Sequence, residues 1–173
     1  MAGAELLLAG TWALALSACD LRWRLLPNWL TLGGAALVLV VRLSIGGWPG
    51  LVDALAAGVV AGLFLLLPFL VRGAGGGDVK MLFAAGAMTG WNRVLLLLWC
   101  MSLAGLVLAV VMLALNQVEG HRLKHYLRCA VDWRYDRTEG AAALPPKESA
   151  KVRVPFALAI SAGLLLALLI RPR

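Results

Sequence analysis

Charged residues are scarce in this chain. Of its 173 residues, 14% are charged and 62% are hydrophobic, and the mean hydropathy is +0.88. Soluble globular domains carry about 25% charged residues, so the composition excludes an ordinary soluble domain of this length. It predicts an integral membrane protein.

Cysteine and histidine are also rare, and neither is arranged as a binding site. Cys19, Cys100 and Cys129 are isolated. Without a CxxC pair they provide neither a tetracysteine zinc module nor a disulfide framework. His121 and His125 have the i, i+4 spacing of metal ligands, but no HExxH pattern or third ligand accompanies them. We therefore expect no metal and no other cofactor.

Most of the sequence consists of long runs of apolar residues. A transmembrane helix needs about 20 mostly apolar residues. Six runs approach this length, at roughly 2–19, 29–46, 51–71, 79–91, 93–115 and 154–170. The connections are brief except for the polar stretch 116–153, which leaves no room for a separate soluble domain. We expect an all-α fold with about six transmembrane helices, in one membrane domain spanning residues 1–173.

The basic residues indicate how these helices are oriented. A net charge of +7 is compatible with nucleic-acid binding, but the basic residues lie at the ends of apolar runs rather than on one face, so we expect no nucleic-acid partner. With the N-terminus outside, the inner side holds twelve of the sixteen Lys and Arg residues: Arg22, Arg24, Arg72, Lys80 and eight in 116–153. The positive-inside rule therefore favours both termini outside.

The end of the first run is similar to a lipoprotein cleavage box, Leu16-Ser17-Ala18-Cys19. Signal peptides begin with a basic region, whereas residues 1–16 contain no Lys or Arg and one acid, Glu5. We expect the first run to be retained as a membrane helix. Cleavage would remove it and change the side on which later segments lie.

An acid stands between two of the apolar runs, at Asp78. The glycines that precede it, at 73, 75, 76 and 77, permit backbone conformations closed to other residues and predict a bent, non-helical segment. Ionisable residues at membrane depth usually face a polar cavity, so Asp78 is a candidate functional residue. The other interpretation is that Asp78 only caps a helix that begins at Val79.

A second acid, Asp20, ends the first run. There it faces the negative end of the helix dipole, which disfavours its charged form, although Arg22 and Arg24 could offset this. Two runs separate Asp20 from Asp78, so both acids are expected on the same side of the membrane and could meet.

Two carboxylates that share a site cannot both ionise easily, so one proton is held between them. One acid can then deprotonate a water molecule while the other protonates or hydrogen-bonds a carbonyl group, as in an aspartic protease. A substrate backbone within lipid keeps its hydrogen bonds internal. An extended, solvated substrate therefore requires a site near the membrane interface.

Other residues near the helix ends have structural interpretations. Pro27 stops helix propagation, and Asn28 is a strong N-cap residue for the second run. The turn residues Gly46-Gly47-Trp48-Pro49-Gly50 separate the second run from the third. Asp53 opens the third run and is expected to cap it or to interact with its dipole.

Two motifs carry a resemblance to a known family. They are Gly75-Gly76-Gly77-Asp78, a GxGD motif followed by Val79-Lys80-Met81-Leu82, and an upstream pair of segments, Asp20-Leu21-Arg22 and Pro27-Asn28-Trp29-Leu30-Thr31. GxGD alone is a weak signal, but the two acid motifs at this spacing are specific. The chain resembles the type IV prepilin peptidases, the GxGD aspartyl proteases of bacterial and archaeal membranes, and is most similar to the small peptidase-only members that serve Flp or Tad-type pili.

The resemblance implies a catalytic dyad of Asp20 and Asp78 at the cytoplasmic face of the inner membrane, in a multi-pass protein surrounded by lipid. It implies supporting or substrate-binding roles for the motif residues, namely Gly75, Gly77, Lys80, Pro27 and Asn28. The implied substrate is a prepilin or pseudopilin, cut between its short basic leader and its hydrophobic helix.

The chain departs from the larger bifunctional members of this family in two respects. Their tetracysteine zinc insert is absent, so N-methylation of the product is not expected. The polar loop 116–153 has no expected counterpart in the shortest members, and we assign it no role. We assign no oligomeric state.

Two other functions stay open, and Lys80 has two interpretations. A membrane carrier could use buried acids to bind protons or cations, although such sites gather at the midplane between inverted repeats, which are not evident here. A structural subunit of a pilus or secretion assembly could use Asp20 and Asp78 only as caps. Lys80 could be a basic anchor at the interface, or its charge could bias the proton equilibrium of Asp78.

Overall fold

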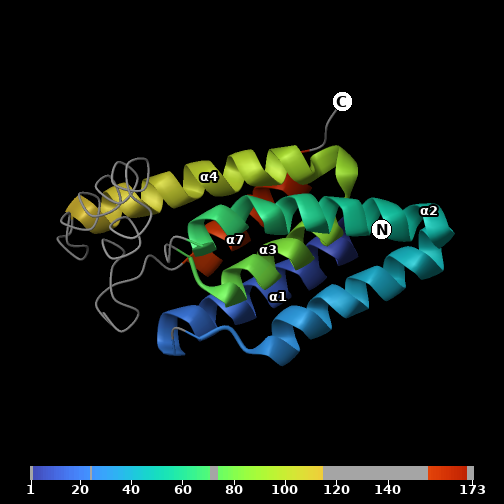
Figure 1. Ribbon diagram of the computed structural model, residues 1–173, viewed down its shortest axis with the longest axis horizontal. Helices are drawn as coiled ribbons and strands as arrows, with labels where there is room; N and C mark the ends of the chain where they lie inside the picture. The colour runs from blue at the N-terminus through green and yellow to red at the C-terminus, as the bar shows by residue number, and fades with distance from the viewer. Residues whose placement is uncertain (1, 24, 71–73, 115–155, 171–173) are drawn as a thin grey trace, which may run out of the picture.

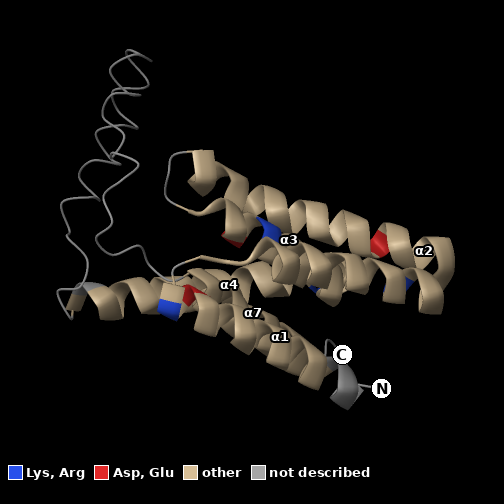
Figure 2. Ribbon diagram, turned by 90° about the horizontal axis from the view of Figure 1, so that it is seen from below, with Lys and Arg blue, Asp and Glu red and all other residues tan. Residues whose placement is uncertain are grey.

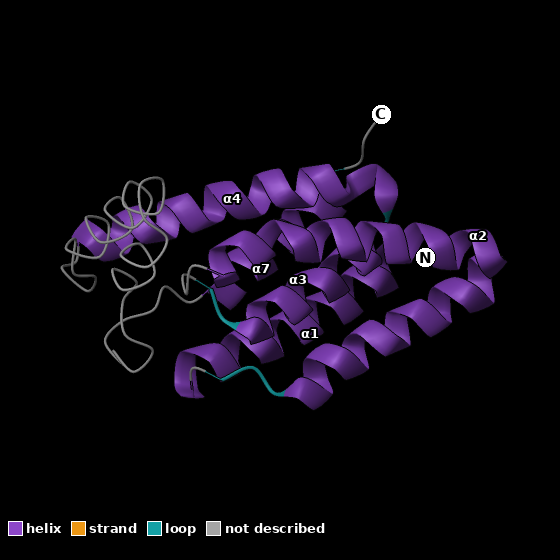
Figure 3. Ribbon diagram, in the orientation of Figure 1, coloured by secondary structure: helices purple, strands orange, loops and turns teal. Residues whose placement is uncertain are grey.

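The computed structural model describes residues 2–23, 25–70, 74–114 and 156–170. Within these ranges every regular element is a helix, and the described residues between helices form short loops (Figure 3). The helices are α1 (Ala2–Trp23), α2 (Asn28–Leu70), α3 (Gly76–Thr89), α4 (Trp91–Ala114) and α7 (Phe156–Leu169). The all-α prediction is confirmed for the described part of the chain. The expected loop 116–153 lies outside it.

Helix α2 is 43 residues long because it joins the second and third predicted runs across a sharp bend. Gly47 has φ 60° and ψ −154°, a conformation that favours glycine. A Cβ atom on Gly50 would lie 2.7 Å from the carbonyl oxygen of Arg42, so the bend also closes too tightly for a side chain there. The chain reverses at this bend, and the two halves of α2 diverge from it (Figure 1). The predicted turn at 46–50 is confirmed.

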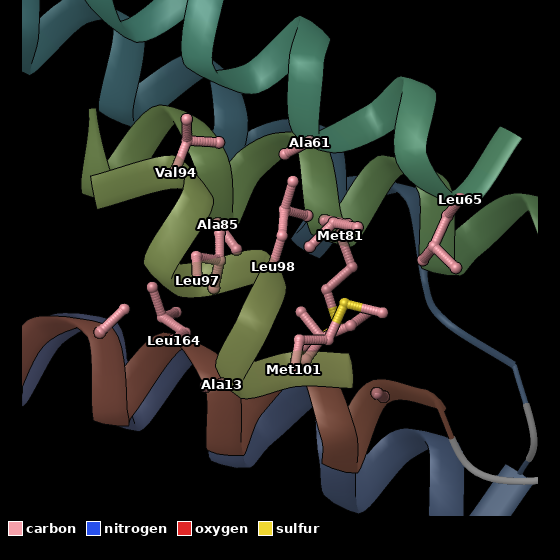
Figure 4. Packing of buried hydrophobic residues seen from close by; sticks show 14 of the residues in the cluster. Ala13, Ala61, Leu65, Met81, Ala85, Val94, Leu97, Leu98, Met101 and Leu164 are labelled. Atoms are coloured by element: carbon pink, nitrogen blue, oxygen red, sulfur yellow. The ribbon is translucent and has the colours of Figure 1, made fainter. Parts of the chain in front are cut away.

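Small side chains let α2, α3, α4 and α7 approach closely. A Cβ atom on Gly86 of α3 would lie 2.5 Å from Cβ of Ala61, and one on Gly163 of α7 would lie 2.7 Å from the backbone nitrogen of Met101. Such contacts are typical of helices packed in membranes. Larger buried residues from four helices fill the remaining space, among them Leu65, Met81, Leu97 and Leu164 (Figure 4).

The outer surface is apolar. Leu14, Trp29 and Trp99 are 65%, 75% and 71% exposed, and few charged residues interrupt the helices (Figure 2). Asn28–Leu70 and Trp91–Met112 are long and apolar enough to cross a membrane, judged by length and composition. An apolar surface of this extent is a liability in water, so these are the features of a membrane protein.

The helix ends gather at two opposite ends of the bundle (Figure 1). One end combines the last turns of α1, the start of α2 and the first turns of α3; we call residues 17–23, 25–31 and 74–81 the acid end. The other combines the bend of α2 with the junction of α3 and α4; we call residues 42–53 and 86–93 the turn end. A single residue, Gly90 with φ 73°, separates α3 from α4 at the turn end.

Candidate active site

Asp78 is a buried residue in the first turn of α3, with 8% of its surface exposed. Its Oδ2 accepts a hydrogen bond from the backbone N–H of Gly75 at 2.9 Å, and its own N–H donates to the Gly75 carbonyl at 3.1 Å. Such a reciprocal arrangement satisfies the N–H groups that a helix start leaves open. Asp78 therefore does cap a helix, as one interpretation predicted, but from three residues inside it.

The glycine segment before Asp78 is less irregular than predicted. Gly75 is extended, with φ −85° and ψ 151°, whereas Gly76 and Gly77 already belong to α3. The prediction of a non-helical segment up to Asp78 was wrong at these two residues. The cause is the carboxylate of Asp78, because its bond to Gly75 starts the helix earlier than glycine propensity alone would allow.

Asp20 lies in the last turns of α1, which continues to Trp23 rather than ending at residue 19. The residue is partly buried, and its Oδ2 atom is shielded from solvent. One turn earlier, the buried Ser17 shares a hydrogen bond of 2.7 Å with Ser161 of α7, and Ser161 Oγ also bonds the carbonyl of Ala13 at 3.1 Å. These bonds fix the end of α1 against α7.

The serine pair was not identified from the sequence. Its two members are 144 positions apart, so no local pattern connects them. A signal was nevertheless present, because a serine inside an apolar run of a membrane protein usually bonds another helix.

The linker that follows α1, the helix of Asp20, touches the start of α3, the helix of Asp78. Residues 25–27 form the linker from α1 to α2, and Leu26 of this linker packs on Gly77, directly before Asp78. A Cβ atom on Gly77 would lie 2.9 Å from Cβ of Leu26, so this close approach requires glycine. The end of α1 that carries Asp20 and the start of α3 that carries Asp78 thus share the acid end (Figure 1).

Asn28 has a different partner from the one predicted. It is the first residue of α2, and the Leu30 and Thr31 N–H groups both donate to the Pro27 carbonyl at 3.1 Å. The side-chain Oδ1 of Asn28 instead accepts a hydrogen bond from Lys80 Nζ of α3 at 2.8 Å. The expected capping role of Asn28 was therefore wrong, because Pro27 occupies the cap position.

Asp53 lies at the turn end and joins two helices. Both of its carboxylate oxygens accept the N–H of Trp91 at 3.3 Å, so it caps α4 rather than its own helix. Nearby, Arg42 Nη2 donates to the carbonyl of Met88 at 2.6 Å, near the end of α3. Both side chains lie against Gly90, where a Cβ atom would come within 2.6 Å of Asp53 Oδ2. The structural interpretation of Asp53 stands, with a changed partner.

Within the described residues, no group of three or more His, Cys, Asp or Glu side chains could hold a metal ion. His121, His125 and Cys129 lie outside these residues. The charged groups described at the acid end are the carboxylates of Asp20 and Asp78 and the basic side chains of Arg22 and Lys80, next to glycine-rich backbone.

Comparison with known proteins gives a consistent result. Residues 7–110 match the type IV leader peptidase family, a range that includes Asp20 and Asp78. The chain is 38% identical over 126 residues to prepilin leader peptidase/N-methyltransferases of Stutzerimonas stutzeri and Pseudomonas aeruginosa, covering 68% of this chain and 43% and 42% of theirs. A Pseudomonas putida protein of the same name is 36% identical over 118 residues, or 64% of this chain and 41% of its own.

The chain thus spans about two fifths of the length of these curated relatives. No solved structure matches it.

Proposed function

Because this chain belongs to the type IV leader peptidase family, we propose that it is a membrane endopeptidase that removes the leader from a prepilin or pseudopilin. The relatives' name also includes an N-methyltransferase activity. The 173 residues contain three isolated cysteines and no tetracysteine cluster, so the proposal is limited to the peptidase step.

The proposed catalytic groups are Asp20 and Asp78, acting as an aspartic-type dyad. The observation that carries the proposal is the contact of Leu26 with Gly77, because it places the linker that follows the helix of Asp20 against the residue before Asp78. Both acids are at least partly shielded from solvent, which strengthens any charge interaction between them.

Helix dipoles suggest how the two acids divide the work. The start of α3 and the Gly75 N–H stabilise negative charge on Asp78, whereas the end of α1 disfavours it on Asp20. We therefore assign Asp78 as the base and Asp20 as the holder of the proton. Asp78 takes a proton from water while the water oxygen attacks the scissile carbonyl carbon, and Asp20 gives its proton to the carbonyl oxygen. The C–N bond then breaks: the leaving amine takes the proton from Asp78, and a hydroxyl of the diol returns a proton to Asp20.

We further propose six membrane crossings, with both termini outside and the acid end at the cytoplasmic face of the inner membrane. The two halves of α2 count as two crossings because the chain reverses at Gly47. Orientation rests on the twelve of sixteen basic residues that this arrangement places inside. The whole chain, residues 1–173, would form one membrane domain with lipid as its surroundings and no nucleic-acid partner.

A site at the cytoplasmic face of the membrane fits a substrate with a basic leader followed by a hydrophobic helix. The leader can lie in the cytoplasm while the helix stays in lipid, and only the peptide bond between them needs to be extended at the acids. Gly76 is exposed and Gly75 partly exposed beside Asp78. Without side chains these positions allow a substrate backbone to come close.

The test is co-expression of the full chain with a candidate prepilin, with leader removal followed by mass. We expect the parent to process the substrate, and Asp20→Asn and Asp78→Asn to abolish processing. Asp53→Asn is the matched control, because it makes the same chemical change at the turn end and should leave processing intact.

The same variants separate the other candidate functions. Asn can still cap a helix, so a protein in which Asp78 is only a cap would keep its folded yield and its function after Asp78→Asn. Processing that persists in both acid variants would refute the dyad. A parent that folds but removes no leader would favour a structural subunit. Acid-dependent ion flux without proteolysis would instead identify a carrier.

A further inference from the structure

Two contacts flank Asp78 and both reach the same short linker region. Gly77, one residue before it, packs on Leu26. Lys80, two residues after it, donates from Nζ to Asn28 Oδ1 at 2.8 Å. The start of α3 is therefore held on both sides of Asp78 by residues 26–28.

The position of Lys80 is electrostatically unfavourable for a simple membrane anchor. Its bond places the ammonium group at the first residue of α2, and a cation near a helix N-terminus is disfavoured by the dipole. Arg22 shows the favourable placement, exposed in the last turn of α1. Lys80 is partly buried, whereas Asn28 and the bond between them are exposed. The ammonium group thus lies at the surface but is directed toward the start of α2.

The bond is linked to Asp20 through a short stretch of chain. Helix α1 ends at Trp23 and α2 begins at Asn28, so the end of α1 cannot move far from Asn28. A change in the distance between Asn28 and Lys80 can therefore be passed through the linker to the end of α1.

We propose that Lys80 and Asn28 are positioning residues, whose hydrogen bond sets the alignment of Asp20 with Asp78. This inference rests on the proposed peptidase function. Neither residue transfers a proton; both act through the placement of the two carboxyl groups. Misplacement of reacting groups by about 1 Å can lower a rate on the order of 100-fold, so loss of the bond should appear mainly in kcat.

The test uses the full chain in lipid nanodiscs with a purified prepilin as substrate. Lys80→Met and Asn28→Leu should each lower kcat about 10-fold to 100-fold, with a smaller change in KM. The double variant should be no slower than the slower single variant, because both remove one interaction. Asn28→Asp keeps an acceptor for Lys80 and should retain most of the parental kcat.

Arg42→Met is the matched control. It removes the other basic side chain that bonds α2 to α3, at the turn end, and should leave kcat within a few-fold of the parent. Additive losses in the double variant, or a parental kcat in Asn28→Leu, would overturn the proposal. A pH profile that shifts in Lys80→Met but not in Asn28→Leu would also overturn it, because the lysine would then act by its charge.

Backbone hydrogen exchange provides a measurement that does not depend on activity. Amides in 28–31 and 76–81 should exchange faster in Lys80→Met and Asn28→Leu than in the parent. In Arg42→Met they should exchange at the parental rate. An active parent with unaltered exchange in the two variants refutes the positioning role alone. A parent that cuts no prepilin refutes the proposed function and the positioning role together.

Discussion

The acid end and the turn end contain similar charged side chains, but these side chains relate differently to the helix dipoles at the two ends. Each has a basic side chain that bonds α2 to α3 and an acid at a helix start. At the turn end, Arg42 bonds a carbonyl near the end of α3 and Asp53 bonds the first N–H of α4, so both agree with the helix dipoles. These bonds explain the positions of Arg42 and Asp53 without any further role.

At the acid end, by contrast, two residues oppose the dipoles. Asp20 lies at the end of α1, and Lys80 bonds the start of α2. Native proteins break local rules mainly at functional sites. The two ends of the bundle therefore differ in whether their charged side chains agree with the dipoles of the helices that they lie on or bond. Substitutions at the two ends test whether this difference reflects function.

The largest expected effect separates the three aspartates. Asp20→Asn and Asp78→Asn should each lower kcat by at least about 10²-fold to 10⁴-fold, the usual contribution of a general acid or base, while Asp53→Asn stays within a few-fold. The measurement is single-turnover cleavage of a prepilin by purified variants. Equal losses in all three would show that the two ends do not differ in function.

The next contrast compares one glycine at each end. Gly86→Ala places a methyl group 2.5 Å from Ala61 Cβ and 2.7 Å from the Ala57 carbonyl oxygen, and such overpacking should cost about 1–3 kcal/mol of stability. Gly77→Ala places a methyl group 2.9 Å from Leu26 Cβ, so the linker must shift to admit it. Because the linker is a short loop rather than a packed helix, we expect a lower kcat with a smaller loss of stability than Gly86→Ala causes. Thermal unfolding in detergent and cleavage rates together would reveal a reversal of this pattern.

A smaller effect is expected from the cap at the turn end. Asp53→Ala removes both acceptors of the Trp91 N–H and should lower the free energy of unfolding by about 1 kcal/mol. Asp53→Asn keeps one acceptor and should recover most of that loss. If the two variants were equally unstable, the charge of Asp53 rather than its capping bond would be the important feature.

The smallest expected effect concerns the serine pair beside the acid end. Ser17→Ala leaves Ser161 with its bond to the Ala13 carbonyl, so the loss of stability should be about 0.6–1 kcal/mol. Equilibrium unfolding of purified protein would measure it. A loss several times larger would mean that the end of α1 depends on this pair more than on its packing.

The sequence predicted the helices well because their signals are local. Apolar runs and the glycines around 47 identify the helices and the reversal within α2 without any knowledge of distant contacts. The start of α3 was misplaced because one carboxylate, that of Asp78, reaches back to Gly75. Glycine-rich sequence alone gives no indication of this bond.

The contacts that organise the candidate site are long-range. Lys80 and Asn28 are 52 positions apart, and each has an adequate local interpretation, as an anchor and as a cap. Only the packing of the linker on α3 shows that they bond each other. The motifs thus indicated which residues to consider, while their partners required the folded chain.

The length of α3 has a consequence for the surrounding bilayer. Its 14 residues extend about 21 Å and the 24 residues of α4 about 36 Å, and only Gly90 separates them. If α4 crosses a hydrocarbon layer about 30 Å thick, α3 stops short and leaves Asp78 submerged beneath the level of the lipid headgroups. Water must then penetrate, or the membrane must become thinner beside α3, so lipids with shorter acyl chains should favour turnover.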